Sequence, residues 1–330
     1  MKNFHVIGVD VSKSTLDVYL HTAKTHFQVD NSNQGMVELL GRALSSLKCK
    51  PADLMICFEN TGKYSKLLSV MLDSQNIKFL MLSALEIKKS LGLTRGKNDK
   101  IDAMRIANYA IEKREKLKPT ILPGVNVDRI KALLSLREKL VRHRTAYKNG
   151  LSDLKDCYVE GENALIVEVQ LNLIGELDKQ IQKVEDEIRM IIHSDDSLEV
   201  NYNLAKSVIG VGPILAAYLI AFTNNFINFD NPRSFACFAG IAPFSESSGK
   251  QKGNARVHPY ANKQLKSLLN MGAMSAIRIP GELKNYYLSR EKAGKNNMST
   301  MNIIRNKIVF RVFAVIKRKV PYINHSKFAA

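Results

Sequence analysis

The sequence predicts an α/β domain at the N-terminus followed by an all-α remainder, and three observations lead to this fold class. Short segments rich in β-branched residues alternate with segments of helical apolar spacing in residues 1–120. Long polar helices then fill residues 121–196, and residues 197–330 are mostly helical with irregular Gly/Pro/Ser-rich stretches. A chain of 330 residues has room for two or three domains, so we expect three domains with these boundaries.

Three short strands open the N-terminal region. Phe4–Val11 is rich in β-branched residues, while Thr15–Leu20 and Thr25–Val29 alternate in polarity, which together predict an antiparallel meander. Helical and buried-strand patterns then alternate along Asn33–Leu47, Leu54–Phe58, Tyr64–Leu72, Ile77–Leu82, and residues 84–91 and 99–113. The resulting order, βββαβαβα, predicts a mixed sheet and is that of the ribonuclease H-like fold, of which RuvC-like domains are an example.

A helical hairpin is expected in the middle of the chain, because two polar segments each carry one apolar stripe. The first stripe consists of Ile130, Leu133, Leu134, Leu140 and Val141. The second has heptad-like spacing and consists of Leu171, Ile174, Leu177, Ile181, Val184, Ile188 and Ile191. Two antiparallel helices joined near residues 159–163 form the simplest arrangement, a coiled-coil spacer. The second stripe either pairs with another copy of the chain, giving a dimer or tetramer, or is used within its own hairpin.

Positive charge is concentrated near the C-terminus. The chain has 49 Lys and Arg against 31 Asp and Glu, a formal net charge of +18. Of these, 17 basic residues and only two acids lie in residues 249–330. Apolar runs interleave with this charge, which indicates a folded nucleic-acid-binding surface and not a solvated tail. Lys317, Arg318 and Lys319 form one basic cluster that we expect to contact phosphates.

Other partner classes receive little support. The four cysteines lie far apart without a CxxC pair, and the seven histidines are scattered, so neither a zinc site nor a disulfide framework is indicated. The N-terminus lacks the apolar core of a signal peptide, and the longest apolar run, Val208–Phe222, contains Gly and Pro and is too short to span a bilayer. We therefore expect a cytoplasmic protein without a membrane role.

Four acids stand out by their positions. Asp10 lies within the first strand and Glu59 ends a later one, while Asp99 and Asp102 are three residues apart at the start of a helix and share one face. Taken singly, each has an ordinary structural explanation, such as a helix cap for Asp99. Together they supply the hard oxygen ligands that a divalent-metal nuclease needs, because Mg²⁺ prefers carboxylates and can hold a scissile phosphate.

These acids carry a resemblance to a known family. The segments GVDVSK, FENTG and RGKNDKIDA resemble the RuvC-like DEDD domain of insertion-sequence transposases related to the Piv DNA invertase. The resemblance implies that Asp10, Glu59, Asp99 and Asp102 hold Mg²⁺, with Mn²⁺ as a possible substitute. It also implies double-stranded donor and target DNA as substrates and a guide RNA, termed bridge RNA, as a partner.

The C-terminal region matches the second domain of the same family. In the segment SVIGVGPILAA, Gly210 and Gly212 form a Gly-x-Gly turn between two helices, similar to a helix-hairpin-helix, which either presents N–H groups to a phosphate or is a plain turn. Farther along, the segment FAGIAPFSESSGK leads to a Ser-Gly pair, and the resemblance implies that Ser248 is the nucleophile, with Ser247 as the alternative. Lys250, Lys252 and Arg256 follow and could balance phosphate charge in the transition state.

The leading hypothesis is a DNA transposase or site-specific recombinase. A serine can attack a phosphodiester and keep the bond energy in a phosphoserine until another strand displaces it, so no energy cofactor is needed. The resemblance implies a composite active site in which two subunits each supply half. The alternatives are a RuvC-like junction endonuclease, in which metal-activated water cuts DNA without a covalent intermediate, and a non-catalytic scaffold, which leaves the four acids unexplained.

Overall fold

The computed structural model describes residues 4–84, 86–87, 99–115, 117–157, 164–242, 247–248, 251–252 and 261–324. The chain divides into two compact units, Met1–Leu122 (unit 1) and Pro123–Ala330 (unit 2). The helix expected at residues 84–91 and the hairpin joint expected at residues 159–163 lie largely outside the described residues.

Unit 1 is built on a five-stranded mixed sheet, as the sequence predicts. The strand order is β3-β2-β1-β4-β5, with antiparallel pairing among the first three strands of the chain and parallel pairing of β1 with β4 and of β4 with β5. The strands are β1 (His5–Val11), β2 (Thr15–Leu20), β3 (Thr25–Asp30), β4 (Leu54–Glu59) and β5 (Lys78–Leu82). Its helices are α1 (Asn33–Leu47), α2 (Lys63–Ser74) and α4 (Asp99–Glu112), with a short 3-10 turn η1 (Pro51–Asp53) before β4.

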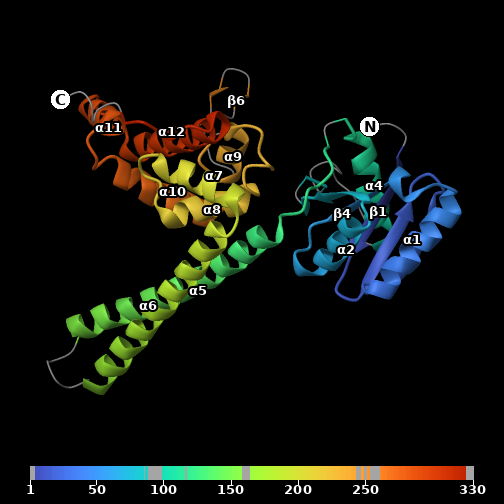
Figure 1. Ribbon diagram of the computed structural model, residues 1–330, viewed down its shortest axis with the longest axis horizontal. Helices are drawn as coiled ribbons and strands as arrows, with labels where there is room; N and C mark the ends of the chain where they lie inside the picture. The colour runs from blue at the N-terminus through green and yellow to red at the C-terminus, as the bar shows by residue number, and fades with distance from the viewer. Residues whose placement is uncertain are drawn as a thin grey trace. The chain divides into compact units, whose positions relative to one another are not determined.

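Helices cover both faces of this sheet (Figure 1). On one face, Ile7 and Val9 of β1 pack with the apolar residues of α1 and α2. On the other face, Met55 and Cys57 of β4 pack against apolar residues of α4 such as Ile106. Burial on both faces explains why β1 and β4 read as nearly continuous apolar runs, which are typical of central strands.

Unit 2 begins with the expected antiparallel helical hairpin, formed by α5 (Val125–Cys157) and α6 (Ala164–His193). Ion pairs link the two helices, including Arg129 with Glu187 at 3.0 Å and Arg137 with Glu185 at 2.6 Å. The apolar stripe of α6 faces inward for most of its length: Ile174, Ile181, Val184, Ile188 and Ile191 are buried. Of the other two members, Leu177 is half-buried and Leu171 is exposed.

The burial of this stripe decides between its two interpretations. Ile181 is 6% exposed and Ile188 is 2% exposed within a single chain. Ile188 also belongs to the apolar core that the hairpin forms with the C-terminal helices of unit 2. These side chains are therefore used inside the chain. The expectation that the α6 stripe from Leu171 to Ile191 pairs with another copy is wrong for its buried members, because they have no apolar surface left to offer.

The rest of unit 2 is a helical domain (Figure 1). Its helices are α7 (Asp196–Ser207), α8 (Pro213–Thr223), α9 (Pro232–Phe238), α10 (Lys263–Ala276), α11 (Glu282–Lys292) and α12 (Asn297–Arg318). Their apolar residues form one core with the end of the hairpin that contains Val127, Ile130 and Ile192. The structure thus groups the hairpin with the C-terminal helices, whereas the three-part division of the chain stays a prediction.

The observed mixture of a mixed sheet with many helices confirms the predicted fold class. A short addition is the antiparallel ladder of β6 (Ser247–Ser248) and β7 (Gln251–Lys252), in a stretch expected to be irregular. Among the described helices, none is both long enough and apolar enough to cross a membrane.

Candidate active site and nucleic-acid interface

Asp10 and Glu59 lie at the same edge of the sheet. β1 and β4 are parallel neighbours, with Val9 opposite Phe58, and the two acids are the next residues along each strand. Side chains alternate along a strand, so each acid lies on the sheet face opposite the one on which Val9 and Phe58 pack against α1 and α2. Both are partly exposed. Two carboxylates from segments about 50 residues apart in sequence therefore share the face that α4 covers.

The direction of α4 brings its acidic end to this edge. The helix crosses β1 at Gly8, where an added Cβ would lie 2.1 Å from the carbonyl oxygen of Ala103. Toward its C-terminal end, Ala110 lines a small cavity with Val6, nearer the start of β1. The helix thus runs opposite to β1, and its N-terminal turn, with Asp99 and Asp102, points toward the carboxyl ends of β1 and β4. The dipole of α4 favours acids in this turn.

Asp102 has a basic partner that the sequence did not point out. One of its carboxylate oxygens accepts a hydrogen bond from Nη1 of Arg105, one turn along α4, at 2.8 Å. The Arg105 side chain is only 15% exposed, so screening of this pair by solvent is reduced. Any cation that binds Asp102 has to share this carboxylate with Arg105.

The acids fit a hard divalent cation in their chemistry, since they offer carboxylate oxygens at one partly exposed edge. The side chain of Asp99 lies outside the described residues. Among the side chains that the structure does describe, no three of His, Cys, Asp or Glu lie close enough together to hold a metal ion. The structure therefore brings the four positions to one end of the sheet, and the three acids whose side chains are described do not by themselves form a metal-binding group.

A fifth acid, Asp17, lies beside this edge and was missed. It stands directly opposite Asp10 in the β1–β2 ladder and its side chain is 8% exposed. Its two oxygens bond to His26 Nε2 at 3.0 Å and to Gln28 Nε2 at 2.9 Å. Such a buried carboxylate is stabilised by its hydrogen bonds. Its signal in the sequence was the same as that of Asp10, an acid between two apolar strand residues.

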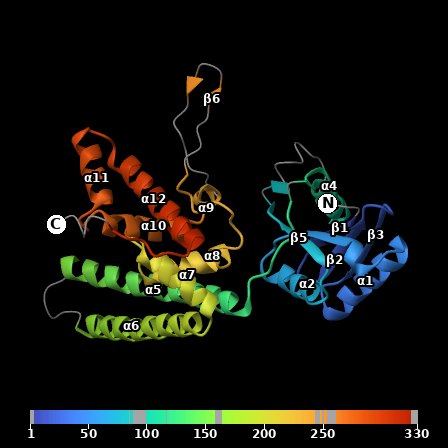
Figure 2. The same cartoon turned by 45° about the horizontal axis from the view of Figure 1, so that its top comes forward.

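Ser248, the expected nucleophile, lies on β6 opposite Gln251 of β7, while Ser247 lies opposite Lys252. Figure 2 shows β6 set apart from α9 and α12. The structure describes only the backbone of these four ladder residues, and Lys250 and Arg256 lie outside the described residues. The expected grouping of basic residues around the serine therefore stays a prediction.

The body of unit 2 fixes both ends of the stretch that contains this ladder. Before it, the carbonyl oxygen of Ile241 accepts hydrogen bonds from the side-chain amides of Asn302 at 2.7 Å and Asn306 at 2.8 Å, both on α12. After it, the backbone N–H of Asn262 donates to the carbonyl oxygen of Phe238 at the end of α9, at 3.0 Å. Residues 242–261 therefore begin and end near α9 and α12.

The Gly-x-Gly turn joins α7 to α8 and packs on α10. Gly210 has φ of +91°, and an added Cβ would lie 2.5 Å from the carbonyl oxygen of Gly272. The backbone N–H of Val211 donates within the turn to Val208. Gly212 is exposed, has an ordinary φ and precedes the first residue of α8. Gly210 is thus explained by packing, and the N-terminus of α8 after Gly212 is the part of the turn that faces solvent.

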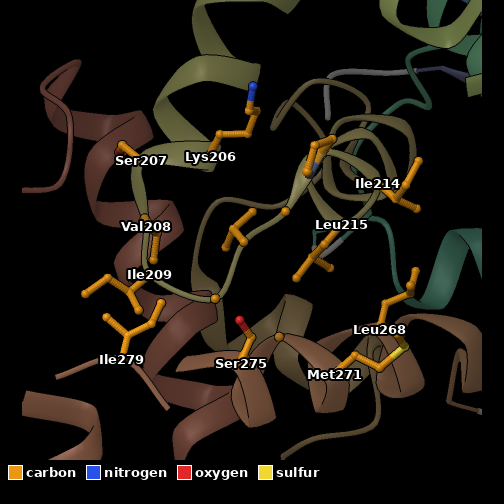
Figure 3. Close-up of a pocket in the computed structure, with 15 residues that line it drawn as sticks. Lys206, Ser207, Val208, Ile209, Ile214, Leu215, Leu268, Met271, Ser275 and Ile279 are labelled. Carbon is orange, nitrogen blue, oxygen red and sulfur yellow. The ribbon is translucent and has the colours of Figure 1, made fainter. Parts of the chain in front are cut away.

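An open groove of about 510 Å³ runs along this turn and α10. Figure 3 shows mostly apolar side chains along it, among them Ile209, Leu268 and Met271, with Ser275 as a polar exception. Its basic residue, Lys206, extends away from the apolar residues. A phosphate backbone is attracted by cations and N–H groups, so the groove itself offers little to nucleic acid.

The basic cluster ends α12. Lys317 and Arg318 are exposed in its last turn, where cations are favoured by the helix dipole. Lys319 has a structural contact: its Nζ donates to Oδ1 of Asn201 on α7 at 2.9 Å. Of the three residues, Lys317 and Arg318 therefore offer the freer positive charge.

Comparison with known families agrees with this arrangement. Residues 7–158 match the DEDD transposase family of IS110 elements, a match that contains all four acids. Residues 202–288 match the transposases of the IS116/IS110/IS902 family, and this match contains the Gly-x-Gly turn and Ser248.

Individual proteins resemble the chain along most of its length. It is 26% identical to the pilin gene-inverting protein of Moraxella lacunata over 329 residues, covering 96% of this chain and 97% of that protein. It is 25% identical to the transposase for insertion sequence element IS1111A of Coxiella burnetii over 258 residues, covering 68% of each chain. The two matched domains together cover most of the chain, which therefore belongs to the IS110/IS116 family of DEDD transposases, a family of DNA recombination enzymes.

Proposed function

We propose that this transposase exchanges DNA strands with a serine nucleophile, Ser248, and a divalent metal held by Asp10, Glu59, Asp99 and Asp102. Mg²⁺ is the expected ion, with Mn²⁺ as a substitute. The observation that carries the proposal is the gathering of four acidic positions from β1, β4 and α4 at one end of the sheet, on one face. Carboxylates gathered at one edge repel one another, so a bound cation would stabilise this arrangement.

The proposed step divides the chemistry between the units. The bound metal would withdraw charge from the scissile phosphate and from the oxygens that attack and leave. The Oγ of Ser248 forms a bond to phosphorus as the bond from phosphorus to a sugar oxygen breaks. The serine hydroxyl loses its proton and the leaving sugar oxygen gains one, so protons balance. A hydroxyl of a second strand later displaces the serine and restores a phosphodiester.

Nucleic acid would be held mainly by unit 2. The region from residue 249 onward carries 17 basic residues and two acids, and Lys317 and Arg318 expose their charge at the end of α12. We expect Lys250, Lys252 and Arg256 to lie near the phosphate that reacts, and the N-terminus of α8 after Gly212 to contact a backbone phosphate. Double-stranded DNA is the substrate in this proposal.

A guide RNA belongs to the same proposal. The positive charge of unit 2 attracts DNA and RNA alike, so base pairing by an RNA is what would supply target choice. Sequencing the RNA that copurifies with the protein tests this point. A single abundant RNA with segments complementary to donor and target supports it, and an unselective mixture of cellular RNA contradicts it.

The metal site is tested by single substitutions. Asp10→Ala, Glu59→Ala, Asp99→Ala and Asp102→Ala should each abolish recombination while unfolding at nearly the wild-type temperature, because a lost ligand disturbs the ion more than the core. Asp73→Ala, which removes an exposed acid of α2, is the matched control and should keep activity. Full activity of any one of the four variants in Mg²⁺ removes that residue from the site.

The assembly is tested by mixing inactive proteins. If two copies each supply half of an active site, Asp10→Ala protein mixed with Ser248→Ala protein should regain part of the lost activity, because some assemblies combine an intact metal site with an intact serine. Neither protein alone should do so. No recovery on mixing, with both variants shown to form the wild-type oligomer, favours a site within one chain.

A further inference from the structure

Arg305 of α12 is a buried cation for which the described part of the chain supplies no anion. It is 3% exposed and sits among the apolar residues of this helix, such as Ile304 and Ile308. Its Nε is enclosed and has no hydrogen-bond partner. Within the described part of the chain, no ion pair or hydrogen bond to its guanidinium is found. This differs from Arg311 on the same helix, which pairs with Glu282.

The acids of the same C-terminal region do not pair with this charge. Residues 249–330 contain two acids, Glu282 and Glu291. Glu282 accepts from both Lys307 and Arg311 on another side of α12, and Glu291 is exposed on α11. Helical spacing places positions 307 and 311 well away from position 305 around the axis.

An uncompensated buried charge is expensive. Burial lowers the pKa of the Arg305 guanidinium from its ordinary value, but arginine still keeps its proton near neutral pH. Leaving an ion unpaired in a protein interior costs several kcal/mol in typical cases, about as much as a core cavity. A buried arginine at such a position therefore points to an anion that the described residues do not supply.

The position of Arg305 indicates which anion. It lies on α12 between Asn302 and Asn306, whose amides hold the carbonyl oxygen of Ile241. Ile241 precedes Ser248 by seven residues. Arg305 thus belongs to the stretch of α12 that holds the start of the serine-bearing segment. Planar guanidinium groups bind phosphate with two parallel hydrogen bonds, and phosphate is the anion that a recombinase brings to its serine.

We propose that Arg305 binds a phosphate group of the nucleic-acid backbone near the point where α12 holds Ile241, at the start of the segment that carries Ser248. This inference rests on the proposed function for the source of the phosphate, whereas the anion site itself follows from the buried charge. Because only 3% of Arg305 is exposed, neighbouring side chains have to shift when the phosphate enters. Arg305 would then link phosphate binding to the position of the segment that carries Ser248.

The first experiment measures the anion site without any DNA. Full-length protein is unfolded thermally in sodium phosphate and in sodium chloride of equal ionic strength, for the wild type, Arg305→Met and Arg278→Met. Arg278 is an exposed arginine of the same unit and serves as the control. At several times the dissociation constant, phosphate should raise the unfolding temperature of wild type and Arg278→Met by roughly 2–4 °C. Arg305→Met should show no phosphate-specific shift.

The chloride arm tests whether the charge is unpaired. Methionine fills a similar volume without charge, so Arg305→Met in chloride should unfold at or above the wild-type temperature. A drop of many degrees, or loss of the fold, would show that Arg305 has an internal partner and would overturn the proposal. Arg305→Lys keeps the charge and should retain part of the phosphate shift. An equal phosphate shift in Arg305→Met and Arg278→Met also overturns it.

The second experiment identifies the source of the phosphate. With DNA, Arg305→Met should form the covalent serine adduct roughly 10–100-fold more slowly than wild type, while overall DNA affinity changes less than about twofold because many other cations remain. Arg305→Lys should recover part of the rate. Unchanged adduct formation in Arg305→Met, with the phosphate shift abolished, would assign the site to free phosphate and contradict the nucleic-acid source. If wild type forms no adduct at all, the proposed function fails, yet the thermal shift still decides the anion site.

Discussion

Replacing Gly8 by alanine should push α4 away from the sheet and disturb the acidic edge. The new Cβ would lie 2.1 Å from the carbonyl oxygen of Ala103 and 2.8 Å from the backbone nitrogen of Ala107. Ordinary contacts between such atoms are above 3 Å, so the helix would have to move by roughly 1 Å. Backbone atoms cannot rotate away as a flexible side chain does, and the movement would carry Asp102 with it.

The cost of this substitution follows from known overpacking effects. Inserting a methyl group into a filled interior typically costs about 1–3 kcal/mol. For a unit of this size that corresponds to a fall of roughly 4–12 °C in unfolding temperature. Metal-dependent DNA cleavage should fall more steeply than stability, because ligand geometry tolerates less displacement than packing does.

The matched control is Gly41→Ala in α1, where an added Cβ meets no atom within 4 Å. Glycine inside a helix is less favourable than alanine by about 0.5–1 kcal/mol, so this variant should be as stable as wild type or more stable. Thermal unfolding and cleavage of labelled DNA are measured for both proteins. If Gly8→Ala matches Gly41→Ala in both assays, α4 does not lie on β1 and the placement of the acids is refuted.

Three further predictions concern unit 2. Gly210→Ala should lose about 2–4 kcal/mol of stability, because of its positive φ and the clash of its Cβ with Gly272. Gly212→Ala should lose under about 1 kcal/mol and change DNA affinity little. Equal losses of the two variants in thermal unfolding would contradict the packing of the turn on α10. Ile188→Asp should lower the free energy of unfolding by about 4 kcal/mol or more, and the protein should aggregate in light scattering. If the variant instead stays folded and is monomeric where the wild type is dimeric, the interpretation of the stripe as a dimer interface is supported. Charge reversal at Lys317 and Arg318 should reduce the slope of log DNA affinity against log salt concentration by about 2. An unchanged slope would mean that these two residues do not contact nucleic acid.

Much of unit 1 could be predicted from the sequence. The strand from His5 to Val11 and that from Leu54 to Glu59 carry β-branched or apolar residues in runs, and the helix from Asn33 to Leu47 shows regular apolar spacing. The order of these elements was enough to predict the mixed sheet. Local pattern works here because each central strand is buried on both faces, so its apolar character is strong.

The partners of the acids could not be predicted, because they depend on contacts between distant segments. Asp17 looked like an ordinary alternating strand residue until the β1–β2 register placed it opposite Asp10. In the same way, the buried position of Arg305 follows from the packing of α12 and not from its own neighbours in sequence. Arg105 is the exception, because it lies three residues after Asp102 on the predicted helix and its i,i+3 spacing could have identified it.

The heptad-like stripe of α6 shows a different limit of prediction from sequence. Spacing predicts that a helix has an apolar face, and Ile181 and Ile188 do face inward. Spacing does not say whether the partner is the same chain or another copy. The core of unit 2, which includes Ile188 and the C-terminal helices, answers that question for the buried residues.

The most direct test of the proposed function is to find where the DNA becomes attached. Protein is incubated with Mg²⁺, the copurified RNA and labelled target DNA, then denatured and digested, and the phosphorylated peptide is identified by mass spectrometry. We expect a phosphoserine linkage at Ser248 that is absent from Ser248→Ala and from Asp10→Ala when each protein is tested alone. Attachment at Ser247 or elsewhere, or cleaved DNA with no covalent adduct at any time point, would contradict it and favour hydrolysis by water.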